Sequence, residues 1–106
     1  MNDRQELQAK LVDILGSNDV YYQPPESIKL KYPCIIYHLA DIRIDNADDV
    51  KYRKYSRYTV TYITKNAEDR FIDKLMDAFE YCSFDRTYSA DHLIHYVVTI
   101  FMRRKS

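Results

Sequence analysis

Two long β-forming runs joined by a short polar turn constrain the fold more than any other feature of this sequence. The first run, CIIYHLADIRID, covers residues 34–45, and the second covers 51–65 and contains YTVTYIT. β-Branched and aromatic residues favour strands, and the intervening NADD is typical of a turn. The pattern therefore predicts one long antiparallel hairpin.

This hairpin is longer than the domain that carries it. The chain has 106 residues, which corresponds to a single domain, 1–106, with a radius of gyration near ~13 Å and a diameter of roughly 33 Å. A strand over 51–65 would span roughly 50 Å. We therefore expect the distal part, residues 42–55, to bend sharply or to project from the core as an arm. Because an isolated two-stranded arm is marginally stable in water, we expect a partner to cover it.

Charges predict the register of the two strands. If the numbers of paired residues sum to 98, two opposite-charge pairs and one cation–aromatic pair face each other: Asp45 with Arg53, Asp41 with Arg57, and Arg43 with Tyr55. A sum of 96 would place Arg43 opposite Arg53, which is unfavourable, and a sum of 94 keeps only one charge pair. The other face then holds four pairs that we expect to meet the helices: Ile36 with Tyr62, His38 with Val60, Ala40 with Tyr58, and Ile42 with Ser56.

The segments around the hairpin predict two helices and further strands. Leucine and isoleucine recur at helical spacing in 3–15, and Gly16, the only glycine, follows where a C-cap glycine belongs. A second helix is predicted over 68–81 from the apolar face that includes Phe71 and Leu75. The other predicted segments are a short strand 20–22, a loop 23–33, strands 84–89 and 93–102, and a flexible basic tail 103–106.

These segments together predict an α+β fold with the element order α-(β)-β-β-α-β-β. Short connections favour antiparallel hairpins, with both helices on one face of the sheet. The sheet is expected to be antiparallel with four strands, or with five if residues 20–22 add one.

Composition argues against several classes of function. Lys plus Arg and Asp plus Glu number sixteen each, so the basic excess that is usual in a nucleic-acid-binding protein is missing. Residues 51–58, KYRKYSRY, do interleave basic and aromatic residues, but the predicted register neutralises part of that charge with Asp41 and Asp45. Eleven tyrosines fit either a protein interface or half-exposed strands. No apolar run reaches the ~20 residues of a membrane helix, and the polar N-terminus resembles no secretion signal, so we expect a protein made in the cytosol.

No constellation of residues predicts an enzyme, a cofactor or a metal site. His92 and His95 should point to different faces, and no Cys-x-x-Cys motif accompanies His38. Ser89, Asp91 and His92 lack a glycine-flanked nucleophile turn. The two cysteines are expected to stay reduced. Four acidic residues near the turn lack the glycine and the closing glutamate of a calcium loop: Asp41, Asp45, Asp48 and Asp49.

Asp85 and Arg86, which precede Tyr88, admit two interpretations. They form either a surface ion pair beside a short strand or part of a contact between subunits.

Two tracts, taken together, resemble a known family. They are YRKYSRYTVTYITKNAED, residues 52–69, and SFDRTYSADHLIHYVVTIFMRR, residues 83–104. Their order and spacing, over most of residues 20–102, resemble the small tail-terminator proteins (tail-completion or head–tail joining proteins) of long-tailed bacteriophages, the siphophages, that infect Gram-positive bacteria. The chain departs from the family at residues 66–68, where Asn-Ala-Glu replaces Asn-Pro-Asp or Asp-Pro-Asp. That departure affects only the turn before the second helix.

The resemblance implies a structural role at the head-proximal end of a virion tail. Such proteins form a hexameric ring that caps the tail tube, stops its growth and docks onto the connector or stopper proteins of the head. DNA passes through the lumen without sequence-specific binding. The resemblance brings no active site, no cofactor and no membrane, and the protein would be made in the host bacterial cytoplasm.

The candidate contacts to a neighbouring subunit or partner lie on the arm and on the strand after the second helix. They are Asp41, Arg43, Asp45, Asp48, Asp49, Lys51, Tyr52, Arg53, Lys54, Tyr55, Arg57, Asp85, Arg86 and Tyr88. Two alternatives stay open: a head-closure or stopper protein of the neck, and a nucleic-acid-binding regulator that uses residues 51–58.

Overall fold

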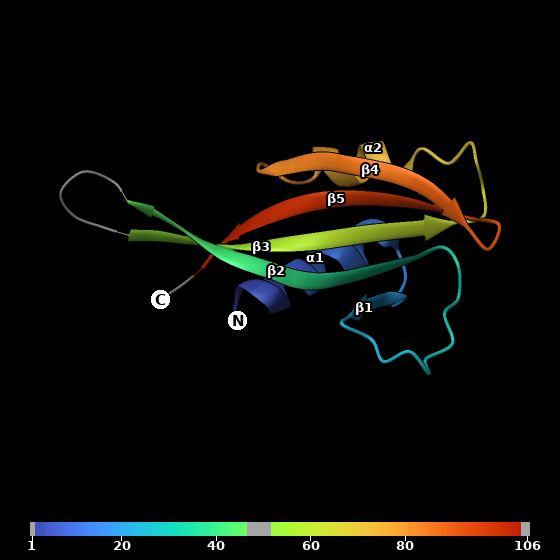
Figure 1. Cartoon of the computed structure of the whole chain (residues 1–106), viewed down its shortest axis with the longest axis horizontal. Helices are drawn as coiled ribbons and strands as arrows, with labels where there is room; N and C mark the ends of the chain where they lie inside the picture. Colours follow the sequence, from blue (N-terminus) through green and yellow to red (C-terminus); the bar gives the residue numbers. More distant parts are fainter. Residues whose placement is uncertain (1, 47–51, 105–106) are drawn as a thin grey trace.

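One five-stranded sheet and two helices make up the fold (Figure 1). The computed structural model of the chain describes residues 2–46 and 52–104, with the side chains of residues 45, 46 and 52 excepted. In chain order the elements are α1 (Asp3–Leu15), β1 (Val20–Tyr22), β2 (Cys34–Asn46), β3 (Tyr52–Thr64), α2 (Phe71–Asp77), β4 (Cys82–Ala90) and β5 (Leu93–Arg103). The expected mixed α+β class is confirmed.

Helix α1 begins and ends where its sequence predicts. The Asn2 side chain accepts a hydrogen bond from the backbone N–H of Gln5, and the Gln5 side chain accepts one from the Asn2 N–H, which forms a capping box. At the other end, Gly16 takes a left-handed conformation with φ of 78° and donates its N–H to the carbonyl of Val12.

Helix α2 is shorter than the predicted range 68–81. Before it, the Asp69 carboxylate accepts the backbone N–H of Phe71 at 2.8 Å and so ties residues 65–70 into a turn. After it, the carbonyl of Tyr81 accepts the N–H of Phe101 at 2.9 Å. The chain has therefore already joined the sheet at residue 81, and β4 begins at Cys82 rather than at the predicted residue 84.

The strand order is β1-β2-β3-β5-β4, and one pairing corrects the prediction of an antiparallel sheet. Strand β1 runs parallel to β2, with Val20 opposite Ile35 and Tyr22 opposite Tyr37. The connection 23–33 carries the chain back to the same end of the sheet, which a tight hairpin cannot do. The remaining pairings are antiparallel.

The hairpin register agrees with the charge-based prediction in its distal half and differs in its core half. Asp41 faces Arg57, Arg43 faces Tyr55, Asp45 faces Arg53 and Ile42 faces Ser56, as predicted. A β-bulge between Leu39 and Asp41 then shifts the register by one, so the predicted core pairs of Ile36, His38 and Ala40 are wrong.

The bulge decides which β2 side chains enter the core. Ile35 and Tyr37 are fully buried, whereas His38 and Ala40 are exposed. A one-residue slip moves every side chain of a strand to the opposite face. The extra residue at the bulge therefore lets β2 bury its apolar side chains near the helices and still pair Asp41 with Arg57.

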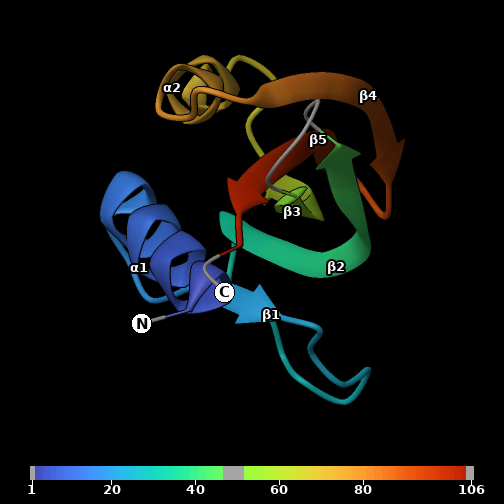
Figure 2. The ribbon, with the colours of Figure 1, turned by 90° about the vertical axis from the view of Figure 1, so that its left-hand side faces the viewer.

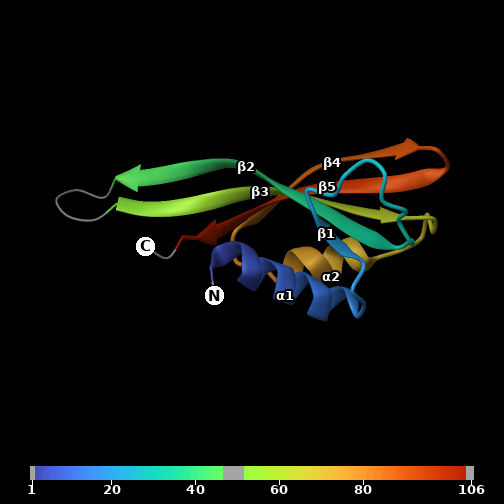
Figure 3. The ribbon, with the colours of Figure 1, turned by 90° about the horizontal axis from the view of Figure 1, so that it is seen from below.

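Both helices cover the same face of the sheet, as expected (Figures 2 and 3). Leu7 and Leu11 of α1 and Leu75 of α2 are completely buried. They pack in one cluster with side chains of the three central strands and β1: Val20, Ile35, Tyr37, Tyr58, Val60, Tyr62, Val98 and Ile100. By strand alternation, the odd-numbered residues of β3 and β5 lie on the opposite face, where Ile63 and Val97 are also buried.

The hairpin extends beyond the other strands (Figure 1). Pairing between β3 and β5 ends at Tyr55 opposite Arg103, so only β2 and β3 pair beyond that point. The molecule is 51 Å long and 25 Å by 22 Å across, with a radius of gyration of 14.7 Å. We use the term arm for residues 42–55, within which the structure describes 42–46 and 52–55.

The basic C-terminal segment corrects the prediction of a solvated tail over 103–106. Arg103 is the last residue of β5. The Arg104 guanidinium donates a hydrogen bond to the hydroxyl of buried Ser56 at 2.8 Å, and its backbone N–H donates to the carbonyl of Lys54 at 2.8 Å. This segment therefore packs against the base of the arm. Lys105 and Ser106 lie outside the described residues.

Candidate subunit interface

A bidentate ion pair lies at the base of the arm, two residues before the pairing of β3 with β5 ends. Arg57 on β3 donates from Nε to Asp41 Oδ1 at 2.8 Å and from Nη2 to Oδ2 at 2.6 Å. These hydrogen bonds lower the pKa of Asp41 despite partial desolvation, and they raise the pKa of Arg57. The pair uses two of the five N–H donors of Arg57 and offsets its positive charge, which leaves less of both for a phosphate.

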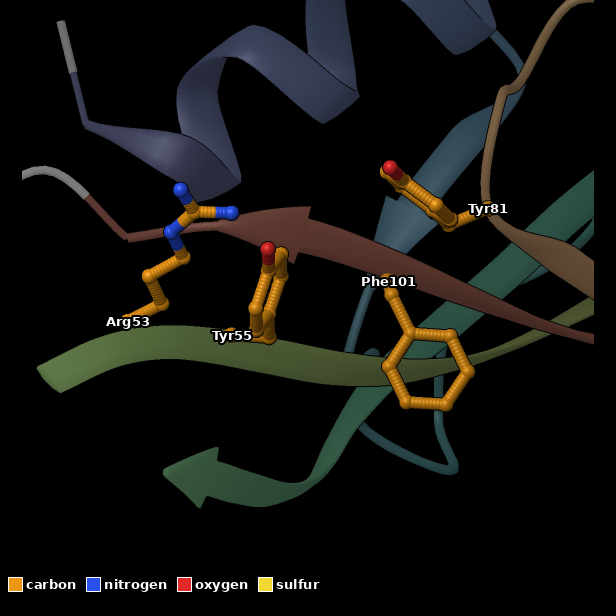
Figure 4. A pocket seen from close by; sticks show the side chains of 4 residues that line it. All are labelled: Arg53, Tyr55, Tyr81 and Phe101. Carbon is orange, nitrogen blue, oxygen red and sulfur yellow. The ribbon is translucent and has the colours of Figure 1, made fainter. Parts of the chain in front are cut away.

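Beside this pair lies a cationic, aromatic pocket with a volume of about 350 Å³ (Figure 4). Arg53 and Tyr55 come from β3, Tyr81 from the segment before β4, and Phe101 from β5. We call these four residues the aromatic pocket. The rings of Tyr55 and Tyr81 meet edge to face with centroids 6.4 Å apart. From β2, the Arg43 guanidinium lies 5.9 Å from the centroid of Phe101.

The opposite face of the arm is apolar. Ile42 faces Ser56 and Ile44 faces Lys54, so their side chains alternate with those of Arg43 and of the aromatic pocket. Ile42 is 46% exposed and Ile44 is 56% exposed. The β2 strand therefore carries two large aliphatic side chains into solvent where the helices no longer cover it.

The other candidate residues on the arm have less defined surroundings. Lys54 is exposed opposite Ile44. In the pairing of β2 with β3, Asp45 lies opposite Arg53 and Tyr52 lies opposite Asn46, but the side chains of Asp45 and Tyr52 are not described. Asp48, Asp49 and Lys51 lie outside the described residues.

The three candidates on β4 form a separate group at the other edge of the sheet. Arg86 Nη1 lies 3.8 Å from Asp85 Oδ2 in an exposed ion pair, next to a β-bulge between Phe84 and Arg86. The Arg86 guanidinium is 5.8 Å from the Tyr88 ring, which stacks on His95 with centroids 4.5 Å apart. The structure thus divides the predicted contacts into an arm group and a β4 group.

Sequence reasoning missed Tyr81 and Phe101. Tyr81 was assigned to the end of the second helix and Phe101 to a buried strand. The alternation of the last strand, in which buried Val98 and Ile100 are followed by half-buried Thr99 and Phe101, was the available signal for Phe101. Its position beside Tyr55 depends on the adjacency of β3 and β5, which no local pattern contains.

A buried polar cluster supports the base of the arm from the helix side. The Tyr58 hydroxyl donates to Asp3 Oδ2 at 2.7 Å, and both residues are buried. Burial raises the pKa of Asp3, but hydrogen bonds from Tyr58 and Ser56 and the charge of Arg104 outweigh it and leave that pKa lowered. Burial and the contact with Asp3 raise the pKa of Tyr58. The cluster therefore connects the start of α1, β3 and the C-terminal segment.

The histidines are not brought together. His38 is exposed on β2, His92 lies in the turn between β4 and β5, and His95 stacks on Tyr88. Within residues 2–46 and 52–104, no cluster of three or more His, Cys, Asp or Glu side chains has the arrangement of a metal site. Over the same residues, no helix is long and apolar enough to span a membrane.

Comparison with known proteins finds a similar fold but no matching family. No protein-family profile matches the sequence, and no curated protein matches it. Among solved structures, a chain from the "Virion of native gene transfer agent (GTA) particle" is similar, with a TM-score of 0.50 and 16% sequence identity. The alignment covers 97% of this chain and 90% of that chain. The likeness therefore extends over nearly the whole of both chains, and at this identity it concerns the fold alone.

Proposed function

We propose that this protein is a virion structural component that acts as a tail terminator. In this role a ring of six copies sits on the last ring of the tail tube, stops elongation of the tube and presents a face to the connector or stopper proteins of the head. The observation that carries the proposal is the fold shared with a chain of a virion over 97% of this chain. The two sequence tracts that resemble tail terminators make the assignment more specific.

The surface of the arm supports a role in assembly. Exposed Ile42 and Ile44 on one face, and the aromatic pocket on the other, are apolar surfaces that a monomer leaves in water. Exposed apolar patches with polar rims are typical of contacts with other proteins. Head-to-tail contacts between identical chains close into rings when the rotation permits.

The proposal treats the chain as a structural protein without a catalytic role or a cofactor. DNA would pass through the lumen of the ring without sequence-specific contacts. The rings of the aromatic pocket, together with Arg53 and the neighbouring Arg43, do favour one competing function. In that function the arm would bind single-stranded nucleic acid by stacking. We prefer a protein partner because Asp41 neutralises Arg57 and because acidic and basic residues balance in the chain.

The test is to remove the gene from the genome that encodes the particle and to image the products by electron microscopy. We expect overlong tails without attached heads, because nothing would stop tube growth. Normal tails with full heads would contradict the proposal. Heads that leak DNA beside tails of normal length would instead assign the chain to the stopper position of the neck.

A variant in which residues 46–50 are deleted and Tyr55 and Arg57 are replaced by alanine tests the part played by the arm. Expressed in place of the wild type, it should also give unterminated tails. A Phe84→Ser variant, altered at an exposed aromatic position on the other edge of the sheet, is the matched control for the arm. Tails that terminate and join heads normally with the arm variant would contradict a role for the arm.

A further inference from the structure

Two exposed surfaces near the base of the arm match each other in chemistry but cannot meet within one molecule. Ile42 and Ile44 project from one face of the β2–β3 ribbon, and Arg53 and Tyr55 project from the other. Tyr81 and Phe101 complete the pocket on the side of Tyr55. Because a strand cannot turn one face onto its other face, burial of the isoleucines against these rings requires a second copy.

The charges near the two surfaces are also complementary. Arg43 and Arg103 lie around the aromatic pocket, and neither forms an ion pair with another described side chain. The sequence that continues from Ile44 is acidic and contains Asp48 and Asp49. An arm that enters the pocket of another copy would therefore bring aliphatic side chains to the rings and carboxylates to the arginines.

The volume of the pocket is sufficient for the side chains of the isoleucines. Its volume is about 350 Å³, near the lower end of the range for sites that take small ligands, and enough for one or two aliphatic side chains. Tyr81 is 56% exposed and is the most open ring of the pocket. Aromatic side chains that are exposed in the free protein and buried on association are typical centres of protein interfaces.

We propose that the aromatic pocket of one copy receives the Ile42–Ile44 face of the arm of the next copy, in a head-to-tail contact. The proposal rests on the proposed function, because it identifies the contact that would join neighbours in the ring. Each copy contributes one arm and one pocket, so the contact propagates and closes only when the ring is complete. It is a contact between copies of this chain and requires no tail tube.

The first experiment measures self-association of the full chain by sedimentation over a concentration series that reaches the millimolar range. We expect the wild type to form species larger than a dimer. Tyr81→Ala and Ile44→Ser should each weaken association at least ~10-fold, the usual effect of truncating a central interface residue. A wild type that stays monomeric throughout would overturn the proposal, as would one that stops at a dimer.

Two matched controls separate this contact from general loss of apolar surface. Phe84→Ser removes a phenylalanine of β4 that is 46% exposed, and Ile28→Ser removes an isoleucine of the 23–33 connection that is 38% exposed. We expect both variants to associate like the wild type. If they weaken association as much as Tyr81→Ala, the arm and pocket are not the contact. Circular dichroism should show the same fold in all four variants.

Mixing the two defective variants tests the pairing of surfaces. Tyr81→Ala keeps an intact arm and Ile44→Ser keeps an intact pocket, so one of each can form one native contact. We expect a mixture to form dimers at concentrations where each variant alone is monomeric, and no larger species. A mixture that stays monomeric contradicts the pairing.

A photoreactive benzoylphenylalanine at position 81 locates the contact directly. We expect cross-links between two chains, with the second chain modified within residues 42–54. Cross-links elsewhere, or only within one chain, would overturn the proposal. A single-stranded oligonucleotide in the same assay distinguishes the competing partner, because efficient cross-linking of residue 81 to DNA would replace the protein contact with a nucleic-acid site.

The outcomes separate this inference from the proposed function. If the Tyr81→Ala and Ile44→Ser variants still terminate tails, the arm-and-pocket contact is wrong while the tail-terminator role stands. If self-association follows the expected pattern but loss of the gene leaves the particles normal, the contact stands and the role in the tail fails.

Discussion

The two halves of the long hairpin have different sources of order. In the core half, Ile35, Tyr37, Val60 and Tyr62 lie under the helices and are almost completely buried. In the arm half, pairing of β3 with β5 ends at Tyr55, beyond which β2 and β3 pair with each other alone, and the Asp41–Arg57 pair lies close to this boundary. The core half thus obtains its register from apolar burial and the arm half from charge, and the bulge between Leu39 and Asp41 reconciles the two.

This difference leads us to expect that the order of the arm, unlike that of the core half, depends on a partner that covers it. A two-stranded ribbon without a covered apolar face is marginally stable in water. The core half has its partners within the chain, whereas the arm half has Ile42, Ile44 and Tyr81 exposed. Substitutions in the two halves should therefore differ in their effect on stability, from large in the core to small in the arm.

The largest effect should come from the core. Leu11 is completely buried beneath the sheet, and Leu11→Ala should lower the free energy of unfolding by about 2–5 kcal/mol, because it leaves a cavity. The matched arm variant, Ile44→Ala, should change it by less than about 0.5 kcal/mol in the monomer. Urea unfolding at low protein concentration measures both. Similar losses in the two variants would remove the distinction between core and arm.

Deletion of Ala40 tests the boundary itself. Without the extra residue of the bulge, either the core half or the arm half must slip by one, which places its side chains on the wrong face. We expect a loss of roughly 1–3 kcal/mol in unfolding free energy, within the range for disrupted packing. Ala40→Ser, which keeps the residue count at an exposed position, should be close to neutral. An unchanged stability of the deletion variant would show that the bulge is dispensable.

The buried contact between Asp3 and Tyr58 should have a comparable or smaller effect. Asp3→Ala leaves the Tyr58 hydroxyl buried without its acceptor, which should cost about 1–3 kcal/mol. Asp13→Ala, at an exposed position of the same helix, is the control and should change little. Thermal unfolding monitored by circular dichroism distinguishes the two variants. Equal melting temperatures would mean that water satisfies the hydroxyl.

The same contacts set the pH limits of stability. The pKa values of Asp3 and Asp69 are lowered in the folded chain, so their stabilisation is present above the unfolded value of 3.8 and is lost as the pH falls through the folded values. The pKa values of Tyr58 and Tyr62 are raised, so their contribution is complete below 10.0 and is lost as the pH rises above it. We expect the free energy of unfolding to fall as the pH drops below about 3.8 and as it rises above about 10, measured by urea unfolding monitored by near-ultraviolet circular dichroism. Tyr58→Phe should weaken the alkaline transition. An alkaline transition unchanged in that variant would contradict the assignment.

The smallest effect on stability should come from the Asp41–Arg57 pair. Both side chains are partly exposed, and salt screens such pairs. Asp41→Asn and Arg57→Ala should each change stability less than the Leu11, Ala40-deletion and Asp3 variants, and a double-mutant cycle should give a coupling that falls with added salt. A coupling that does not respond to salt would show that the pair behaves as a buried one.

Much of the fold could be predicted because local signals agree with the tertiary packing. The capping residues and Gly16 give the bounds of α1, and cross-strand charges give the register of the arm. The bulge could not be predicted, because Ile36 and Ile35 are equally apolar and only packing against the helices selects between them. Two contacts shorten α2. The Asp69 side chain holds a turn before the helix, which the apolar periodicity does not reveal. The backbone of Tyr81 pairs with β5, which lies about twenty residues further along the chain.

The candidate interface was predictable only in part for the same reason. Arg53, Tyr55 and Arg57 stand out within KYRKYSRY, and the structure places them at the base of the arm. Tyr81 and Phe101 join them through the strand order β3-β5-β4, which arises from the packing of the whole sheet. The β4 residues Asp85, Arg86 and Tyr88, which the sequence places on a separate strand, lie at the other edge of the sheet.

Hydrogen exchange tests most directly whether the arm depends on a neighbouring copy. The amides of residues 44–46 and 52–54 should exchange quickly in dilute monomer and slowly at concentrations where the chain associates, while those of Ile35, Tyr37 and Val60 stay protected in both. Arm amides that are as protected in the dilute monomer as in the assembled protein would contradict the account.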